Sequence, residues 1–221
     1  MDKSSKDLEL SGLRQNYLKS SLRRKDLTVE PLSLFQKWFA EAINSSLREP
    51  NAMILGTVKD NAPSSRTVLL KRFDNAGAIF YTNYKSKKAR DIEINSKVSL
   101  LFPWYEIEKQ VIILGNAERI SREESLIYFK SRPIESQLGA WVSEQSDVIT
   151  SRNVLERKLE ESKVKFGNKN IPIPEFWGGF RVKPLEFEFW QGRENRLHDR
   201  FRYKLKEHSD QDHWEVERLS P

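Results

Sequence analysis

The stretch that decides the fold runs from Leu185 to Arg200 and reads LEFEFWQGRENRLHDR. Its first six residues alternate apolar and polar side chains, which is the period of a strand with one buried face. Gly192 marks the predicted point where the backbone leaves the sheet. Three arginines and a histidine then follow Trp190 at the rim of the sheet, where ligand sites commonly lie. We interpret this cluster as a site for an anionic ligand; a surface loop with fortuitous charge is the alternative.

Length and composition predict a globular protein without a membrane span. The 221 residues can bury a full core, and a single domain is a simpler prediction than a tight pair. Charged residues make up 32% of the chain and the mean hydropathy is −0.68. No apolar run is long enough to cross a bilayer, so partners in a membrane are not expected.

The absence of cysteine excludes disulfides, thiolate nucleophiles and thiolate metal sites. Residues 1–7 also lack the apolar segment of a secretory signal, and together these features predict a cytoplasmic protein. The net charge of +6 results from 38 basic and 32 acidic residues that are mixed along the chain. This mixture favours local patches for small phosphorylated ligands over a nucleic-acid surface. An RNA-binding module remains an alternative because the pI is about 9.4.

Two regions are predicted: a mobile N-terminal arm at residues 1–30 and a single domain at residues 31–221. In the arm, the basic run at residues 23–25 is interpreted as a solvated charge run, with a regulatory ligand site as the alternative. The domain opens with a helix that Pro31 begins and that ends near Pro50. Its apolar residues recur at helical spacing and indicate core packing: Leu34, Phe35, Trp38, Phe39, Ala42 and Ile43.

The rest of the domain combines strands with shorter helices. Strands are predicted at residues 52–58, 65–73, 78–83, 98–104, 110–120, 180–182, 185–190, 201–205 and 214–219. Helices are predicted at residues 86–94, 121–131 and 151–166, the second with a capping box of Ser121 and Glu124. Turn signals at Asp60-Asn61 and at residues 74–77 indicate antiparallel hairpins. This order predicts a mainly β fold with inserted helices, in the form of an antiparallel barrel.

Phosphate must be held by side chains in this chain, because both common glycine-rich phosphate motifs are absent. Cations and hydroxyls for this purpose are supplied by three segments: residues 66–71, 81–88 and 131–136. In the first segment, Arg66 and Lys71 fall on opposite faces of a strand. In the second, Ser86 caps a helix whose free N–H groups, with Lys87 and Lys88, form an anion site. A solvated first helical turn is the alternative for these lysines.

The third segment follows a helix that Pro133 is expected to end. Tyr128, Arg132 and Ser136 combine a guanidinium fork with two hydroxyls, which are suitable phosphate donors. A structural salt link of Arg132 is the alternative.

Histidine is the remaining group with chemistry near neutral pH. His208 and His213 lie in a polar loop that has the composition of an ordinary exposed turn, so no metal site is predicted there. His198 is the predicted proton-handling group. The chain also lacks a serine triad and a His-Glu-x-x-His motif.

Taken together, these segments resemble the pyridoxamine 5′-phosphate oxidase family over nearly the whole chain. The most specific motifs are RTVLLK at 66–71, FYTN at 80–83, SLLFPW at 99–104, SRP at 131–133, GAWVS at 139–143, FWGGFR at 176–181 and the segment 190–200. The resemblance implies an antiparallel split β-barrel of the FMN-binding type. It also implies a homodimer that binds one flavin mononucleotide (FMN) at each of two sites across the subunit interface.

The resemblance further assigns the residues of the site. Contacts to FMN are implied for Arg66, Thr67, Val68, Leu69, Leu70, Lys71, Tyr81, Thr82, Lys87, Lys88, Gln110, Gln145, Ser146, Trp190 and Arg200. Contacts to the substrate are implied for Lys71, Tyr128, Arg132, Ser136, Arg196, His198, Arg14 and Tyr17. Arg196 and His198 are the implied catalytic residues, and Arg14 and Tyr17 belong to an arm that closes over the substrate. Lys87 stands where relatives often carry arginine, which keeps the charge but loses the planar fork.

The implied reaction converts pyridoxamine 5′-phosphate or pyridoxine 5′-phosphate to pyridoxal 5′-phosphate, with dioxygen reduced to hydrogen peroxide. We expect hydride to leave the C4′ carbon of a substrate that charge-assisted bonds and Arg196 hold against the flavin. His198 acts there either as a base or as an orienting group. A flavin- or haem-binding split barrel without this activity is the alternative, and the second phosphate site at Arg132 and Ser136 argues against it.

Overall fold

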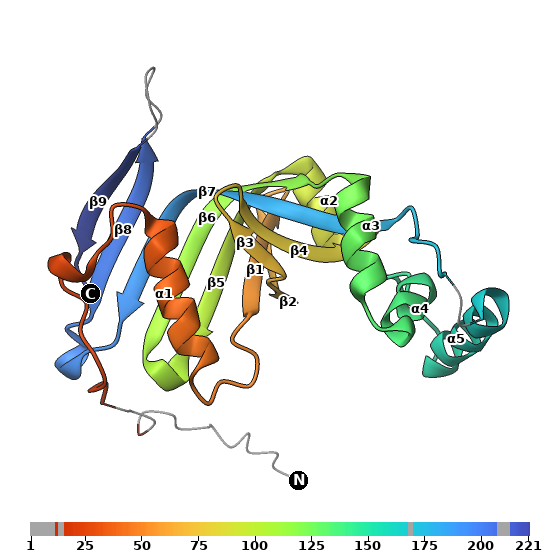
Figure 1. Ribbon diagram of the computed structural model, residues 1–221, viewed down its shortest axis with the longest axis horizontal. Helices are drawn as coiled ribbons and strands as arrows, with labels where there is room; N and C mark the ends of the chain where they lie inside the picture. Colours follow the sequence, from red (N-terminus) through yellow and green to blue (C-terminus); the bar gives the residue numbers. More distant parts are fainter. Residues whose placement is uncertain (1–11, 13–15, 168–169, 207–212) are drawn as a thin grey trace, which may run out of the picture.

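One antiparallel sheet of nine strands forms the frame of the described part of the chain, which comprises residue 12 and residues 16–167, 170–206 and 213–221 (Figure 1). In this computed structural model the strands are β1 (Ala52–Lys59), β2 (Ala62–Leu69), β3 (Arg72–Asp74), β4 (Gly77–Asn83), β5 (Lys97–Trp104), β6 (Lys109–Arg119), β7 (Trp177–Gln191), β8 (Asp199–Lys206) and β9 (His213–Leu219). The α-helices are α1 (Pro31–Ile43), α2 (Lys87–Ile94), α3 (Arg122–Ser131), α4 (Ile134–Val142) and α5 (Arg152–Phe166). Short 3-10 helices are η1 (Arg24–Asp26), η2 (Tyr105–Ile107) and η3 (Glu194–Arg196).

The two edge strands of the main strand order, β2 and β3, follow each other directly in the sequence. The order is β2-β1-β5-β6-β7-β4-β3, and β8 and β9 extend from β7. Between β2 and β3 lie only Leu70 and Lys71, so the sheet curls back on itself at this connection. The Leu70 N–H donates to Asn51 O and the Lys71 N–H donates to Ile79 O, each at 2.8 Å. The continuous strand predicted at residues 65–73 is therefore wrong, because the chain changes sheet edges there.

Strand β7 joins the two halves of this split barrel. Its first residues pair with β4, its last residues pair with β8, and β6 runs along most of its length. The separate strands predicted at residues 180–182 and 185–190 are thus one strand. Pro184 does not end it, because the register shifts at its partner Gly115 and such an irregularity tolerates proline. A Cβ at Gly115 would lie 2.1 Å from Lys183 O, so this approach of two strands requires glycine.

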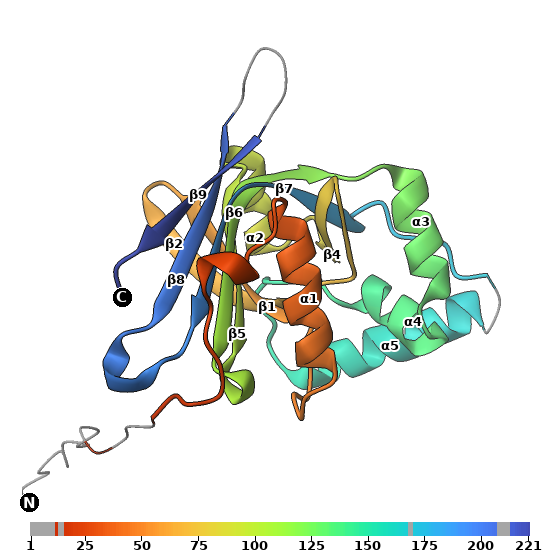
Figure 2. The ribbon, with the colours of Figure 1, turned by 60° about the vertical axis from the view of Figure 1, so that its left-hand side comes forward.

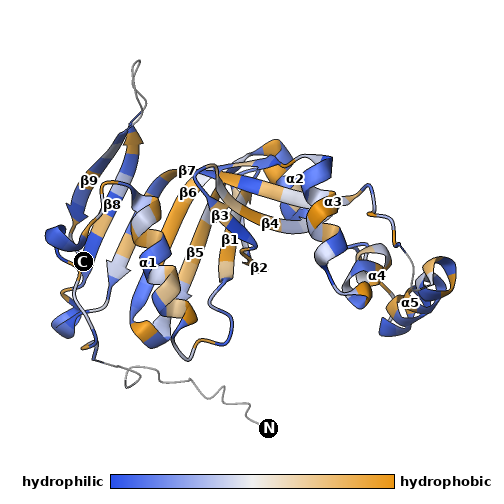
Figure 3. Cartoon of the chain, viewed as in Figure 1, coloured by the Kyte–Doolittle hydropathy of each residue, from blue (hydrophilic) through white to orange (hydrophobic). Residues whose placement is uncertain are grey.

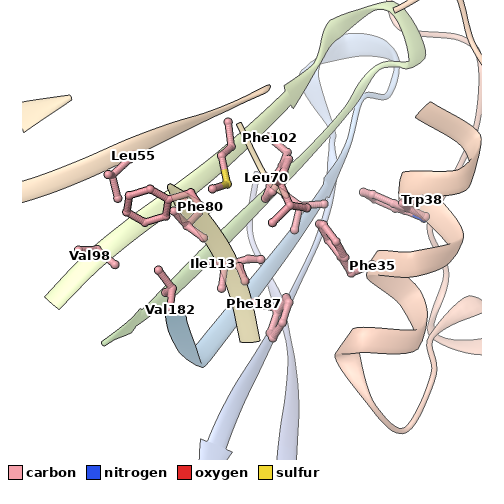
Figure 4. Packing of buried hydrophobic residues seen from close by; sticks show 14 of the residues in the cluster. Phe35, Trp38, Leu55, Leu70, Phe80, Val98, Phe102, Ile113, Val182 and Phe187 are labelled. Atoms are coloured by element: carbon pink, nitrogen blue, oxygen red, sulfur yellow. The ribbon is translucent and has the colours of Figure 1, made fainter. Parts of the chain in front are cut away.

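The core lies between the inner face of the sheet and α1 (Figure 4). Alternate residues of β5 are buried there: Val98, Leu100, Phe102 and Trp104. The predicted apolar stripe of α1 faces this core, and the Phe35 ring centroid lies 4.5 Å from that of Phe73 and 5.1 Å from that of Phe102. Ile43 is an exception and is 56% exposed at the end of the helix. Figure 3 shows hydrophobic residues along β5 and β6 and mostly hydrophilic residues on α5.

Helices α3, α4 and α5 lie together beyond the end of β4 (Figures 1 and 2). The predicted helices at residues 121–131 and 151–166 are confirmed, and Ser121 Oγ accepts the Glu124 N–H at 3.0 Å. Helix α4 lies outside the predicted elements, because Pro133 precedes a new helix as its N-cap instead of ending the helical region. A second, smaller core holds this part together: Phe129, Leu138, Ala140, Ile171 and Trp177.

The N-terminal region contacts the sheet at Leu22. Leu22 is 2% exposed within the main core, and its N–H donates to Asp199 Oδ2 at 3.1 Å. The basic residues at positions 23–25 are exposed, as expected of a solvated charge run. The predicted mobility of residues 1–30 stays a prediction, and most of residues 1–15 lie outside the described residues. No helix in the described ranges is long and apolar enough to cross a membrane.

Candidate active site

A cavity of about 620 Å³ lies where the barrel is split. Its walls come from the end of β2, the β2–β3 connection, β4, α2, α3, α4 and the start of β7. The lining residues are Thr67, Val68, Leu69, Lys71, Tyr81, Thr82, Asn83, Lys88, Tyr128, Arg132, Pro133, Ser136, Gly139, Ala140, Ser143, Gln145 and Trp177. Lys71, Tyr128, Arg132 and Ser136, the four predicted donors to the substrate phosphate, are all among them. Eight of the predicted FMN contacts also line the cavity: Thr67, Val68, Leu69, Lys71, Tyr81, Thr82, Lys88 and Gln145.

Arg132 is partly buried and is the first of two cations in this cavity that have no carboxylate partner among the described residues. Its Nη1 atom is buried and has no hydrogen-bond partner among the described residues. Its guanidinium Cζ lies 4.8 Å from the ring centroid of Trp177, and its carbonyl accepts the Gln137 Nε2–H at 2.8 Å. Burial lowers the pKa of Arg132, although a guanidinium stays charged at neutral pH. A buried charge with a free donor needs an anionic acceptor, and a phosphate supplies one. The structural salt link considered for Arg132 is not formed with any described carboxylate.

Lys88 is the second of these cations, and it is 9% exposed. Its Nζ donates to Thr82 Oγ1 at 3.2 Å, to Gln145 Oε1 at 3.0 Å and to Ser86 Oγ at 3.4 Å. All three acceptors are neutral, so the described residues leave the charge of Lys88 uncompensated. Burial, followed by the nearby charge of Arg66, lowers the pKa of Lys88 to about 8.

The start of α2 differs in detail from the predicted anion site. Ser86 occupies the N-cap position, but its side chain makes no capping hydrogen bond and instead accepts from Lys88. The Lys87 N–H donates to Ser146 Oγ at 3.1 Å. The Lys87 side chain is half exposed and pairs with Asp91 Oδ2 at 3.0 Å. Lys87 is therefore partly neutralised, whereas Lys88 is not.

Arg66 does not line the cavity. It alternates with Thr67 along β2, and its Nη1 donates to Thr57 Oγ1 at 2.7 Å. The predicted placement of Arg66 and Lys71 on opposite faces of one strand does not apply, because Lys71 lies in the connection after β2. Its Nη2 lies 3.8 Å from the carboxylate of Asp91, which is 2% exposed and also accepts from Thr57. Asp91 and Thr57 are thus residues of this region that were absent from the predicted site.

A second group of predicted residues lies beside the segment that follows β7. The ring of His198 lies 4.6 Å from that of Trp190 and 5.7 Å from that of Tyr17. The Arg193 N–H donates to His198 Nδ1 at 3.1 Å. Burial and the charge of Arg196 lower the pKa of His198. Arg14 lies outside the described residues.

Gln110, Trp190 and Arg200 form a row across three strands. Gln110 is the cross-strand partner of Trp190, and Trp190 is the partner of Arg200. All three occupy half-exposed positions on the face of the sheet turned away from the core. We name these residues, with Tyr17, Arg196 and His198, the rim group, and the lining residues of the cavity the cavity group.

The single chain keeps these two groups apart. None of the rim group lines the cavity. Figure 1 shows β8 at one end of the molecule and α3 and α4 at the other. The sequence therefore predicted members of both groups, but one chain does not bring them into one site. Two further features stand outside the prediction: the Trp177 contact to Arg132, and the role of Gln137 on the carbonyl of the same residue.

Metal ligands do not gather elsewhere in the described ranges, where no group of three or more histidine, aspartate or glutamate side chains is placed to hold an ion. His208, part of the polar loop considered above, lies outside those ranges.

Comparison with known proteins assigns the chain to a family. Residues 39–166 match the family model described as pyridoxamine 5′-phosphate oxidase, and residues 177–221 match the pyridoxine 5′-phosphate oxidase C-terminal dimerisation region. The pyridoxine/pyridoxamine 5′-phosphate oxidase of Prochlorococcus marinus (strain MIT 9303) is 54% identical over 222 residues and covers 100% of both chains. That of Escherichia coli (strain SE11) is 50% identical over 214 residues, or 96% of both chains.

Solved structures share the fold. PhzG from Burkholderia lata 383, in complex with tetrahydrophenazine-1-carboxylic acid, superposes with a TM-score of 0.83 at 30% identity, over 90% of this chain and 98% of that one. A pyridoxamine 5′-phosphate oxidase-related, FMN-binding protein from Nostoc punctiforme PCC 73102 superposes with a TM-score of 0.67 at 16% identity, over 88% and 100%. The predicted split barrel and the resemblance stated from the motifs are confirmed. The chain belongs to the pyridoxine/pyridoxamine 5′-phosphate oxidase family.

Proposed function

We propose that the protein oxidises pyridoxamine 5′-phosphate and pyridoxine 5′-phosphate to pyridoxal 5′-phosphate with FMN as cofactor, at sites that two copies of the chain build together. The observation that carries this proposal is a pair of cations in one cavity, the partly buried Arg132 and the buried Lys88, neither of which has a carboxylate partner among the described residues. Two uncompensated cations fit two phosphates, one on the cofactor and one on the substrate.

Lys88 and its neighbours are the groups that would hold FMN. The neutral acceptors around Lys88 orient its ammonium without cancelling its charge, and the Gln145 and Ser146 segment closes beside it. The indole of Trp190 and the guanidinium of Arg200 offer a flat surface and a cation for a ring system. When bound, FMN supplies the acceptor for the hydride that the substrate loses.

The substrate phosphate would be held at the other part of the cavity by Lys71, Tyr128, Arg132 and Ser136. Charge-assisted bonds from the guanidinium and ammonium, with bonds from the hydroxyls, fix the far end of the molecule. The pyridine ring is then held at reacting distance, with Arg196 against it. The reaction removes two electrons and two protons at the C4′ amine or alcohol, and dioxygen receives them as hydrogen peroxide. The alcohol gives the aldehyde directly, whereas the amine gives an imine that water hydrolyses to the aldehyde and ammonia.

His198 serves in this proposal as a hydrogen-bond donor. Its Nδ1 accepts the Arg193 N–H, so in the neutral imidazole the proton resides on Nε2. The lowered pKa keeps the ring neutral near pH 7. The free Nε2–H can therefore orient an acceptor atom of the substrate, whereas the basic nitrogen is already engaged by the backbone.

Assembly of the site across two chains rests on three features. The rim group and the cavity group are separate in one chain, and the matched dimerisation region at residues 177–221 contains most of the rim group. The outer face of the sheet also carries a groove of about 1030 Å³, with Val58, Leu114 and Leu185 at 37%, 40% and 38% exposure. An apolar face of this kind is suited to a second copy of the chain. A cytoplasmic location, proposed from the absence of cysteine, is consistent with a small-molecule enzyme.

Anaerobic mixing with pyridoxamine 5′-phosphate tests the activity. The purified protein is expected to be yellow, and its visible absorption should bleach on mixing and return when air is admitted. A protein that binds flavin without bleaching would be a binding module of the same fold. A colourless protein with salt-sensitive affinity for RNA would support the RNA-binding alternative instead.

A further inference from the structure

Trp177 is the first residue of β7, and its ring forms part of the cavity wall beside Arg132. It is 7% exposed and belongs to the smaller core. Its ring lies 5.4 Å from that of Tyr81 at an interplanar angle of 11°, and 6.2 Å from that of Tyr128 at 9°. The rings of Tyr81 and Tyr128 stack at 3.9 Å. The three rings are thus nearly parallel.

Arg132 rests on the same indole. Its Cζ lies 4.8 Å from the Trp177 centroid and 5.8 Å from that of Phe129, whose ring meets Trp177 edge-on at 5.3 Å. A single side chain therefore contacts the guanidinium of Arg132 and aligns with the ring of Tyr128. Both of these are predicted donors to the substrate phosphate.

Arg181, on the same strand as Trp177, is an arginine that carboxylates hold in place of an aromatic ring. Its Nη1 lies 2.9 Å from Asp74 and its Nη2 lies 3.1 Å from Glu124, so two carboxylates fix it and neutralise it. An aromatic face also fixes a guanidinium, but it carries no net charge and leaves the full positive charge for a ligand. The free Nη1 of Arg132 is consistent with a cation held in this second way.

We propose that Trp177 is a positioning residue that aims Arg132 at a phosphate monoester without neutralising it. The inference rests on the proposed function, because it takes the ligand of Arg132 to be the substrate phosphate. Trp177 acts on the phosphate through Arg132, whose guanidinium it supports.

The test compares Trp177→Leu and Trp177→Phe with matched changes at Trp141. Trp141 packs against the same smaller core and has a cation–π contact of its own, to Lys165, but no contact to Arg132. For Trp177→Leu we expect KM for pyridoxine 5′-phosphate to rise on the order of tenfold, and for Trp177→Phe about threefold, because phenylalanine keeps an aromatic face. The kcat and the FMN dissociation constant should change less than about twofold. Trp141→Leu should leave KM unchanged.

A double-mutant cycle with Arg132→Ala separates this inference from the function on which it rests. If Arg132→Ala alone leaves KM unchanged, the phosphate site of the proposed function is wrong and the inference fails with it. If Arg132→Ala raises KM and Trp177→Leu adds nothing further in that background, Trp177 acts through Arg132 as proposed. An equal further rise in that background, or an equal effect of Trp141→Leu, overturns the inference. If the Trp177→Leu variant does not fold, the same comparison of KM values is made with Trp177→Phe, and the same outcomes support or overturn the inference.

Discussion

The cavity group and the rim group both contain arginine, but Arg132 in the cavity and Arg200 in the rim group are held in different ways. In the cavity, Arg132 and Lys88 contact rings, hydroxyls and an amide, and their charges stay uncompensated within the described residues. In the rim group, Arg200 pairs with Glu188 at 2.8 Å, and the neighbouring Arg193, which is not a member of the group, lies 3.7 Å from Asp199. The neutral supports in the cavity leave positive charge for the two phosphates of the proposed function, whereas the charge of Arg200 is already balanced within the chain.

The largest effect is expected at Arg132. Arg132→Ala should raise KM for pyridoxine 5′-phosphate on the order of a hundredfold, because a buried charge-assisted contact to phosphate is lost. FMN should remain bound. Arg181→Ala is the control: it leaves Asp74 and Glu124 without their partner, so it should lower the free energy of unfolding yet leave KM unchanged. Steady-state kinetics with chemical denaturation of both variants checks the contrast, which disappears if the two arginines behave alike.

His198 is expected to give the next largest effect. The side-chain amide of His198→Gln can place an N–H near the position of Nε2, whereas that of His198→Asn reaches only to Nδ1, so the glutamine variant should retain several-fold more activity. Because the pKa of His198 is lowered, its ring stays neutral to a more acidic pH than an ordinary imidazole, so activity should extend further toward acid. An acidic limb of the pH–rate profile that vanishes in both variants would instead identify His198 as a base.

Lys88 should give the smallest effect and the most specific pH dependence. The pKa of Lys88 is about 8 before an anion binds, so its charge is present below pH 8 and is lost above it. The affinity for FMN should therefore fall above pH 8, by up to about tenfold for each pH unit, because phosphate binds the charged form. Titration of the apoprotein by flavin fluorescence measures this. The Lys88→Met variant should bind FMN weakly at every pH, without the fall in affinity above pH 8. If that fall persists in the variant, a group other than Lys88 causes it.

The sequence predicted most of the fold because β1 and β5 alternate buried and more exposed residues and because α1 carries a stripe of aromatic residues. It missed α4, where a proline that ends one helix also precedes the next, and it divided β7 at Pro184, which the register shift at Gly115 accommodates. The break between β2 and β3 could not be read from periodicity, because closure of the barrel there depends on pairing with distant strands.

The site was predicted unevenly for a related reason. The motifs indicated the donors Lys71, Tyr128, Arg132 and Ser136, and the structure gathers all four in one cavity. Residue patterns could not show that the rim group lies elsewhere in the same chain, because that depends on sheet register and on which face each residue occupies. Trp177 was part of a recognised motif, but its contact to Arg132 follows from tertiary packing alone.

Hybrid dimers of Arg132→Ala and Arg196→Ala chains test most directly whether each site is shared between two copies. At a substrate concentration near the wild-type KM, both parent variants should be nearly inactive. In a hybrid, one site combines both substitutions, and the other combines the intact cavity of one chain with the intact rim of its partner. Random mixing of the two chains should therefore restore about a quarter of the wild-type activity, since half of the dimers are hybrids with one working site. Restored activity at this level is the predicted result, and a mixture as inactive as its parents would show that each chain builds its site alone.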